Sequence, residues 1–130
     1  MAVDIGSLVQ RFWARMNEND WAAAAEVFSE NFVFTWPQSS ERILSRADFA
    51  AINTCYPANG RWSFTIDRFV VSATTAVTEV HVTDGTIHAT AITFFESDGN
   101  GLSRITEYWP DPFPAPAWRS AWVEVAGTGS

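Results

Sequence analysis

The sequence predicts an α+β domain whose helices lie on one face of a curved antiparallel sheet. Three observations support this class. Apolar residues recur at helical spacing near the N-terminus, residues 62–109 alternate as strands do, and turn residues separate those strands at short intervals. Helices that precede a run of sequential strands are typical of α+β folds. At 130 residues, the chain is expected to form one domain over 1–130.

Three helices are expected before residue 57. The first carries a single apolar stripe, and Asp20 can cap a second at Ala22–Ala25. Ser45 and Asp48 resemble a capping box for a third helix, which Pro57 ends. The stripe of the first helix consists of Ile5, Leu8, Val9, Phe12, Trp13 and Met16.

The strands are indicated by alternation and by β-branched residues. Phe32, Phe34 and Trp36 alternate with smaller residues up to Pro37, which ends a strand. The later strands are expected at 62–72, 73–83, 86–96 and 102–109.

The Asp84-Gly85 pair predicts a two-residue hairpin that pairs Thr83 with Thr86. Because cross-strand partners share a face, the hairpin sorts its side chains into two sets. One face carries Glu79, His81, His88, Thr90 and Ile92, and the other carries Val80, Val82, Ile87, Ala89 and Ala91.

Composition excludes several classes of function. A net charge of −7 with only eight scattered basic residues disfavours nucleic acid and anionic membranes as partners. The single Cys55 cannot form an internal disulfide, and no leader or membrane-length apolar run is evident, so a cytoplasmic location is expected. No zinc, phosphate-loop or dinucleotide motif is present, so we expect neither a metal nor a cofactor.

A strap rich in Pro and Trp follows the last strand at 109–124. Its four prolines favour an extended, semi-rigid backbone, and its Trp and Phe rings are large enough to require burial. We therefore expect the strap to pack on the body of the domain, on a partner subunit or at a ligand site.

The segments Trp36–Ile43, Asn53–Pro57 and Tyr108–Phe113, together with the element order, resemble the nuclear transport factor 2-like (cystatin-like) superfamily. The resemblance is to its bacterial SnoaL-like proteins. It implies a cone-shaped sheet wrapped around three helices, with a pocket at the wide end. The superfamily includes polyketide cyclases, ketosteroid isomerases and limonene epoxide hydrolases, as well as binding modules, so it leaves function open.

Two carboxylates are candidates for proton transfer. The resemblance implies a pocket carboxylate that shuttles the proton of a carbonyl substrate, and Glu107 or Glu79 is placed there. If the face of Glu107 is concave, neighbouring rings raise its pKa. Otherwise each carboxylate forms an ion pair or faces solvent. Tyr56 and His88 are candidates for assistance at the substrate oxygen.

The remaining site candidates are pocket-lining residues. Gln38 follows Trp36 in a loop at the expected pocket mouth, while the Trp residues belong either to the core or to the pocket wall. The full set of ligand-binding candidates is Trp13, Trp36, Gln38, Trp62, Thr90, Ile92 and Trp109.

Two functions remain open. One is a cofactor-free cyclase, isomerase or hydrolase that acts on a small apolar carbonyl compound, and the other is a non-catalytic ligand-binding or dimerisation module. We also expect a homodimer, because helices can cover only one face of the sheet. The apolar patch assigned to its interface is Val80, Val82, Ile87, Ala89, Ala91 and Phe95.

Overall fold

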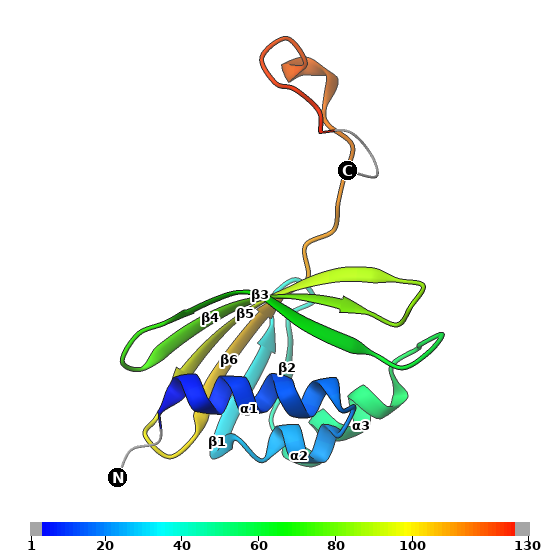
Figure 1. Ribbon diagram of the computed structural model, residues 1–130. Coiled ribbons are helices and arrows are strands. Elements are labelled where there is room, and N and C mark those ends of the chain that lie inside the picture. The colour runs from blue at the N-terminus through cyan, green and yellow to red at the C-terminus, as the bar shows by residue number, and fades with distance from the viewer. Residues whose placement is uncertain (1–3, 127–130) are drawn as a thin grey trace.

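Three helices cover one face of a curved, six-stranded sheet in the computed structural model, which describes residues 4–126 (Figure 1). This arrangement confirms the predicted α+β class. The helices are α1 (Ile5–Asn17), α2 (Trp21–Ala25) and α3 (Arg46–Cys55). The strands are β1 (Phe28–Trp36), β2 (Glu41–Ile43), β3 (Ser63–Val71), β4 (Thr75–Thr83), β5 (His88–Ser97) and β6 (Leu102–Tyr108).

Helix α1 forms where its apolar stripe predicts. The Asp4 carboxylate caps the helix by accepting from the backbone N–H of Ser7 at 3.0 Å. All six residues of the predicted stripe are buried against the sheet and the other helices. The side chains of Asp20 and Ser45 cap α2 and α3 in the same way.

The sheet order is β2-β1-β6-β5-β4-β3, and the sheet is mixed rather than wholly antiparallel. Strand β1 pairs with β6 in parallel, while the other neighbours are antiparallel. The sequence does not indicate this pairing, because it joins distant segments. Gln38 lies in the expected loop, and Glu41–Ile43 form edge strand β2, which was not predicted. The parallel pairing places the end of β1 beside the end of β6.

The predicted register of the β4–β5 hairpin is wrong by two residues. Thr83 pairs with His88, so Asp84 to Ile87 form a four-residue loop. The Asp84 carboxylate accepts from the backbone N–H groups of Thr86 and Ile87 at 3.0 and 2.8 Å, and this lengthens the turn. Because the error is an even number, the strand residues keep their predicted faces.

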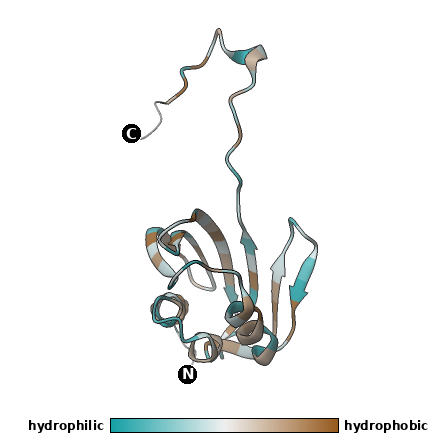
Figure 2. Ribbon diagram, turned by 90° about the vertical axis from the view of Figure 1, so that its right-hand side faces the viewer, coloured by the Kyte–Doolittle hydropathy of each residue, from teal (hydrophilic) through white to brown (hydrophobic). Residues whose placement is uncertain are grey.

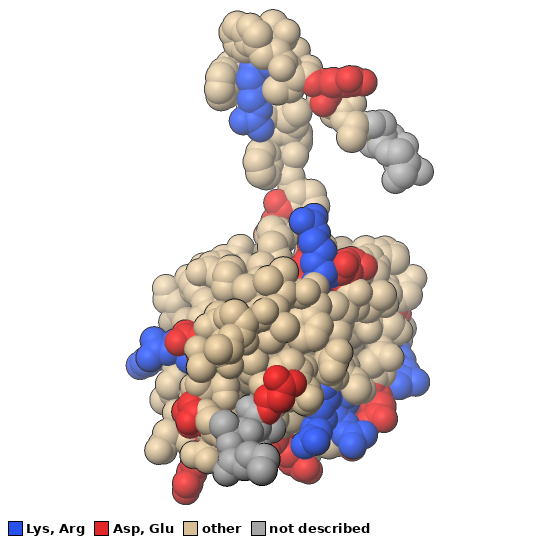
Figure 3. Space-filling view, turned by 60° about the vertical axis from the view of Figure 1, so that its left-hand side comes forward, with Lys and Arg blue, Asp and Glu red and all other residues tan. Residues whose placement is uncertain are grey.

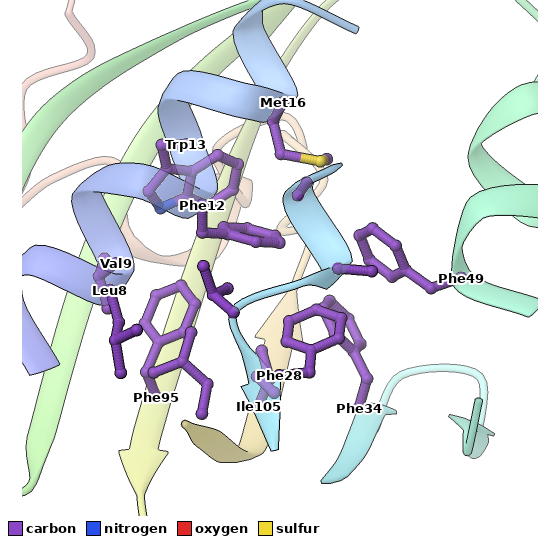
Figure 4. Close-up of a cluster of buried hydrophobic side chains, with 14 of the residues drawn as sticks. Leu8, Val9, Phe12, Trp13, Met16, Phe28, Phe34, Phe49, Phe95 and Ile105 are labelled. Carbon is purple, nitrogen blue, oxygen red and sulfur yellow. The ribbon is translucent and has the colours of Figure 1, made fainter. Parts of the chain in front are cut away.

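The core lies between the helices and the inner face of the sheet, as Figure 4 shows. The Phe12 ring contacts rings from three other elements, with centroids 5.7–6.0 Å away at Phe28, Phe49 and Phe95. The patch assigned to the dimer interface belongs mostly to this core: Val80, Ala91 and Phe95 are fully buried. That assignment is therefore corrected, because the helices cover this face and leave the Glu79 face open.

The strap contacts the body of its own chain only at its start, where Trp109 packs against the core, and from Phe113 onward its large rings are exposed. It leaves the end of β6 and stands away from the sheet and the helices (Figures 1 and 2). Trp118 and Trp122 are 74% and 78% exposed, and the Arg119 guanidinium lies 5.7 Å from the Trp118 ring centroid. Trp118 and Trp122 are therefore not buried within their own chain, because the prolines hold this part of the strap extended and away from the core.

Surface charges of both signs are interspersed over the face drawn in Figure 3. Within residues 4–126 there is no helix long and apolar enough to cross a membrane.

Candidate functional site

Glu107 is the buried carboxylate at the centre of the candidate site. It lies on β6 and is only 5% exposed. It shares the inner face of the sheet with buried Ile105, because residues two apart along a strand point the same way. The alternation along β6 therefore turns the Glu107 side chain toward the helices. This is the arrangement that the sequence analysis described for Glu107 on a concave face.

Three side chains donate hydrogen bonds to the Glu107 carboxylate. The indole Nε1 groups of Trp36 and Trp109 donate to Oε1 at 3.0 and 3.1 Å. The hydroxyl of Thr93 donates to Oε2 at 2.8 Å. The sheet assembles these donors: Thr93 is the cross-strand partner of Glu107 on β5, and the parallel β1–β6 pairing brings Trp36 alongside.

Burial dominates the electrostatics of Glu107. It raises the pKa of this carboxyl above its ordinary value, because the charged form loses its hydration, while the bonds from Trp36, Thr93 and Trp109 act in the opposite direction. No basic side chain forms an ion pair with Glu107 within residues 4–126. The direction agrees with the expectation from the sequence.

Glu107 lies on the wall of a cavity of about 460 Å³ between the helices and the sheet. Half of the lining residues are aromatic, and five of the seven Trp side chains contribute to the lining. The aromatic lining residues are Phe12, Trp13, Trp21, Phe34, Trp36, Phe49, Tyr56, Trp62, Phe64 and Trp109.

Two polar residues at the cavity are held by the backbone. The side-chain amide of Gln38 donates to the Trp109 carbonyl at 3.1 Å and accepts from the Trp109 N–H. Asn53 donates to the carbonyl of Phe49 at 2.9 Å, which leaves its side-chain oxygen free of that bond. Tyr56 is 57% exposed, and its ring packs edge-on against Trp62.

The structure brings seven of the predicted site residues to one cavity and separates four from it. Glu107, Tyr56, Trp13, Trp36, Gln38, Trp62 and Trp109 line the cavity. Trp13 also belongs to the core, where its indole N–H donates to buried Thr78 at 3.1 Å.

Glu79, His88, Thr90 and Ile92 lie on the outer face of the sheet. They cannot share a cavity with Glu107, because they alternate with inner residues such as Val80 and Ala91. Glu79 instead forms an ion pair with Arg68 at 2.6 Å. An ion pair was one of the alternatives left open by the sequence, although Arg68 was not among the expected partners. The placement of these four residues in the pocket is therefore corrected.

The two His residues of the outer face contact each other. Nδ1 of His88 lies 3.2 Å from Nε2 of His81, and their rings stack with centroids 5.2 Å apart. Across residues 4–126, no group of three or more His, Cys, Asp or Glu side chains is placed to hold a metal ion.

Sequence reasoning missed Thr93 as a partner of Glu107. Its detection requires the register between β5 and β6, which shifts between Glu96 and Ser97 at the irregular turn over 97–101. It also missed the contribution of Phe12, Phe34, Phe49 and Phe64 to the wall. Their apolar character is visible in the sequence, but core and cavity wall have the same composition.

A curved sheet over three helices, with a cavity between them, defines the nuclear transport factor 2-like class of fold. Residues 9–108 match the SnoaL-like domain family, and the chain belongs to that family. No curated protein matches the sequence.

Three solved structures illustrate the similarity. A ketosteroid isomerase candidate from Kribbella flavida is 29% identical with a TM-score of 0.83, over 95% of this chain and 90% of that one. A protein of unknown function from Burkholderia xenovorans is 27% identical with a TM-score of 0.76, over 95% of both chains. A candidate SnoaL-like polyketide cyclase from Shewanella denitrificans shares the fold at 12% identity, with a TM-score of 0.66 over 81% and 89%.

Proposed function

We propose that the cavity binds a small, largely apolar molecule and that Glu107 transfers a proton on it without a cofactor. The observation that carries this proposal is the position of Glu107: a buried carboxylate without an ion pair, on the wall of an aromatic cavity. Binding sites for small molecules are typically concave and apolar, with a few convergent polar groups. Membership of the SnoaL-like family and the similarity to cyclase and isomerase candidates also support it.

The environment of Glu107 supports a role in proton transfer. Burial raises its pKa, and a general base works best when its pKa lies close to the operating pH. A substrate with an acidic C–H beside a carbonyl would give this proton to Glu107 and recover it at another position. The reaction class is then isomerisation or cyclisation. Tyr56 lies at the same cavity and is the candidate donor to the substrate oxygen.

The second candidate function is ligand binding without turnover. One observation favours it: both carboxylate oxygens already accept hydrogen bonds, three in all. These bonds favour the charged form and restrict the movement of the carboxylate. Glu107 would then be an anionic anchor rather than a base.

The first experiment identifies what the protein retains. Native mass spectrometry of the purified protein should detect a bound small molecule, which is then assayed as a substrate. Glu107→Gln should lower turnover by roughly a hundredfold or more, the usual scale for a general acid or base, while binding persists.

The matched control is Glu79→Gln, which removes a mid-strand carboxylate from the outer face. It should leave turnover unchanged. If Glu107→Gln also leaves turnover unchanged, Glu107 is not the base. If the retained molecule is released chemically unaltered under all assay conditions, the binding function is supported instead.

A further inference from the structure

Among the residues that the structure describes, the cavity is lined by acidic side chains and by no basic ones. Glu107, Glu41 and Asp111 contribute carboxylates, and no Arg, Lys or His from residues 4–126 lines the cavity. An anionic ligand would meet repulsion here, and a cation would be attracted, because the apolar walls screen charges weakly.

The aromatic lining adds to this preference. Five Trp rings surround the cavity together with four Phe rings and Tyr56. Aromatic faces carry partial negative charge, and Trp attracts a nearby cation more strongly than Phe or Tyr does. Several aromatic rings around one cavity are the means by which proteins recognise substituted ammonium groups.

The Glu107 carboxylate retains capacity for one more hydrogen bond. A carboxylate has about four acceptor positions, and three are occupied here. Oε1 accepts from both indoles, whereas Oε2 accepts only from Thr93. An ionised carboxylate cannot donate, so a ligand that bonds to it must supply an N–H or an O–H group.

Glu107 also lacks a partner of opposite charge. A buried carboxylate is costly unless it is paired, and no described basic side chain reaches it. A cationic ligand would supply the missing charge and favour the ionised form of Glu107.

We propose that the ligand of this cavity carries a substituted ammonium group with at least one N–H, placed against Glu107, with its apolar substituents among the Trp rings. The proposal rests on the proposed function in one respect only, namely that the cavity is the binding site. It names a class of ligand, apolar amines that are protonated at neutral pH.

Three probes that share a benzyl group test the sign of the preferred charge. Protonated N,N-dimethylbenzylamine is the cation, isobutylbenzene is its neutral counterpart of the same shape, and phenylacetate is the anion. Binding is measured for the wild-type protein at neutral pH by calorimetry and by tryptophan fluorescence. We expect the cation to bind about tenfold or more tightly than isobutylbenzene, and phenylacetate to bind more weakly than either.

Glu107→Gln then localises the effect. It should weaken binding of the cation by about tenfold or more and change that of isobutylbenzene by less than about twofold. Glu30→Gln is the matched control, because it removes the same charge from an exposed position that does not line the cavity. It should leave all three affinities unchanged.

Equal or tighter binding of isobutylbenzene overturns the cationic ligand but leaves an apolar binding cavity, and so the proposed function, in place. Failure of all three probes to bind at millimolar concentration overturns both. The comparison of probes uses the wild-type protein, so it decides the question even if Glu107→Gln does not fold.

Discussion

Gln38 and Trp109 are joined by two hydrogen bonds between the side-chain amide of one and the backbone of the other. The amide of Gln38 thus takes the place that a neighbouring strand would have beside Trp109. This contact fixes the backbone from which the Trp109 indole reaches Oε1 of Glu107. Gln38 therefore positions a donor of the site.

Replacement of Gln38 tests this role. Gln38→Ala should free the Trp109 backbone and weaken the indole bond to Glu107, so the pKa of Glu107 should rise further. The cost in stability should be about 0.5–1.5 kcal/mol, the usual net value of such hydrogen bonds. Carboxyl titration by NMR measures the pKa, and denaturant unfolding measures the stability.

Ser39→Ala is the control for Gln38→Ala, because Ser39 is exposed in the same turn and its hydroxyl bonds to Glu41. It should not shift the titration of Glu107. An unshifted Glu107 in Gln38→Ala would show that Trp109 is held by other contacts.

The raised pKa of Glu107 predicts how stability depends on pH. The folded state keeps its proton to higher pH than the unfolded state, whose ordinary value is 4.5. The folded state therefore binds more protons in the window above 4.5, and its stability falls as pH rises through that window. Glu107→Gln lacks this titration.

The measurement is the free energy of unfolding of both proteins from pH 4.5 upward. The wild type should lose stability relative to Glu107→Gln until pH exceeds the folded pKa, after which the difference is constant. A difference that does not change with pH would mean that Glu107 titrates alike in both states.

Asp84 predicts the opposite slope at lower pH. Backbone N–H groups of Asn59, Ile87 and Thr86 bond to its carboxylate and lower its pKa from 3.8 to about 2. Its stabilising effect is present above 3.8 and is lost as pH falls to about 2. The advantage of the wild type over Asp84→Asn in melting temperature should therefore shrink across this range.

Asp84→Asn should also disturb the turn, because an amide offers one acceptor oxygen where the carboxylate offers two. Backbone amide shifts of Asn59, Thr86 and Ile87 in NMR spectra report this directly. Unchanged shifts would contradict the role assigned to Asp84 in the four-residue loop.

The strap and the open face of the sheet predict a homodimer. Phe113, Trp118 and Trp122 are exposed on the strap, and Phe94 and Tyr108 form an edge-on pair on the outer face. We propose that a second copy covers these surfaces, since rings of this size are rarely left in water. Truncation after Asp111 should convert the dimer to a monomer and lower the melting temperature.

Sedimentation at tens of micromolar measures this outcome. Glu124→Gln alters a polar strap residue and should leave the dimer intact. A full-length protein that sediments as a monomer would contradict the proposal, as would a truncated protein that melts like the full-length one.

The sequence was sufficient for elements whose pattern is local. The stripe from Ile5 to Met16 determines a helix by itself, and alternation sorted Glu79 and Val80 to opposite faces even though the hairpin register was wrong. The sequence could not show which face the helices cover, because both faces of β5 carry apolar residues. The face that the helices cover depends on tertiary packing. It determines that Glu107, and not Glu79, lies in the cavity wall.

The partners of Glu107 were beyond local reasoning for a related reason. Thr93 requires a register across an irregular turn, and Trp36 requires a parallel pairing between β1 and β6. Neither a turn nor a periodic pattern indicates that pairing.

The bond between Trp36 and Glu107 joins residues 71 positions apart. During synthesis, β6 leaves the ribosome after the other five strands, so the Glu107 carboxylate meets the Trp36 indole only after those strands are available. Contacts of such separation are slow to form, because a long loop must close first. The cavity can therefore bind a ligand only after the entire sheet has assembled. A bound ligand would then stabilise the domain as a whole rather than one hairpin.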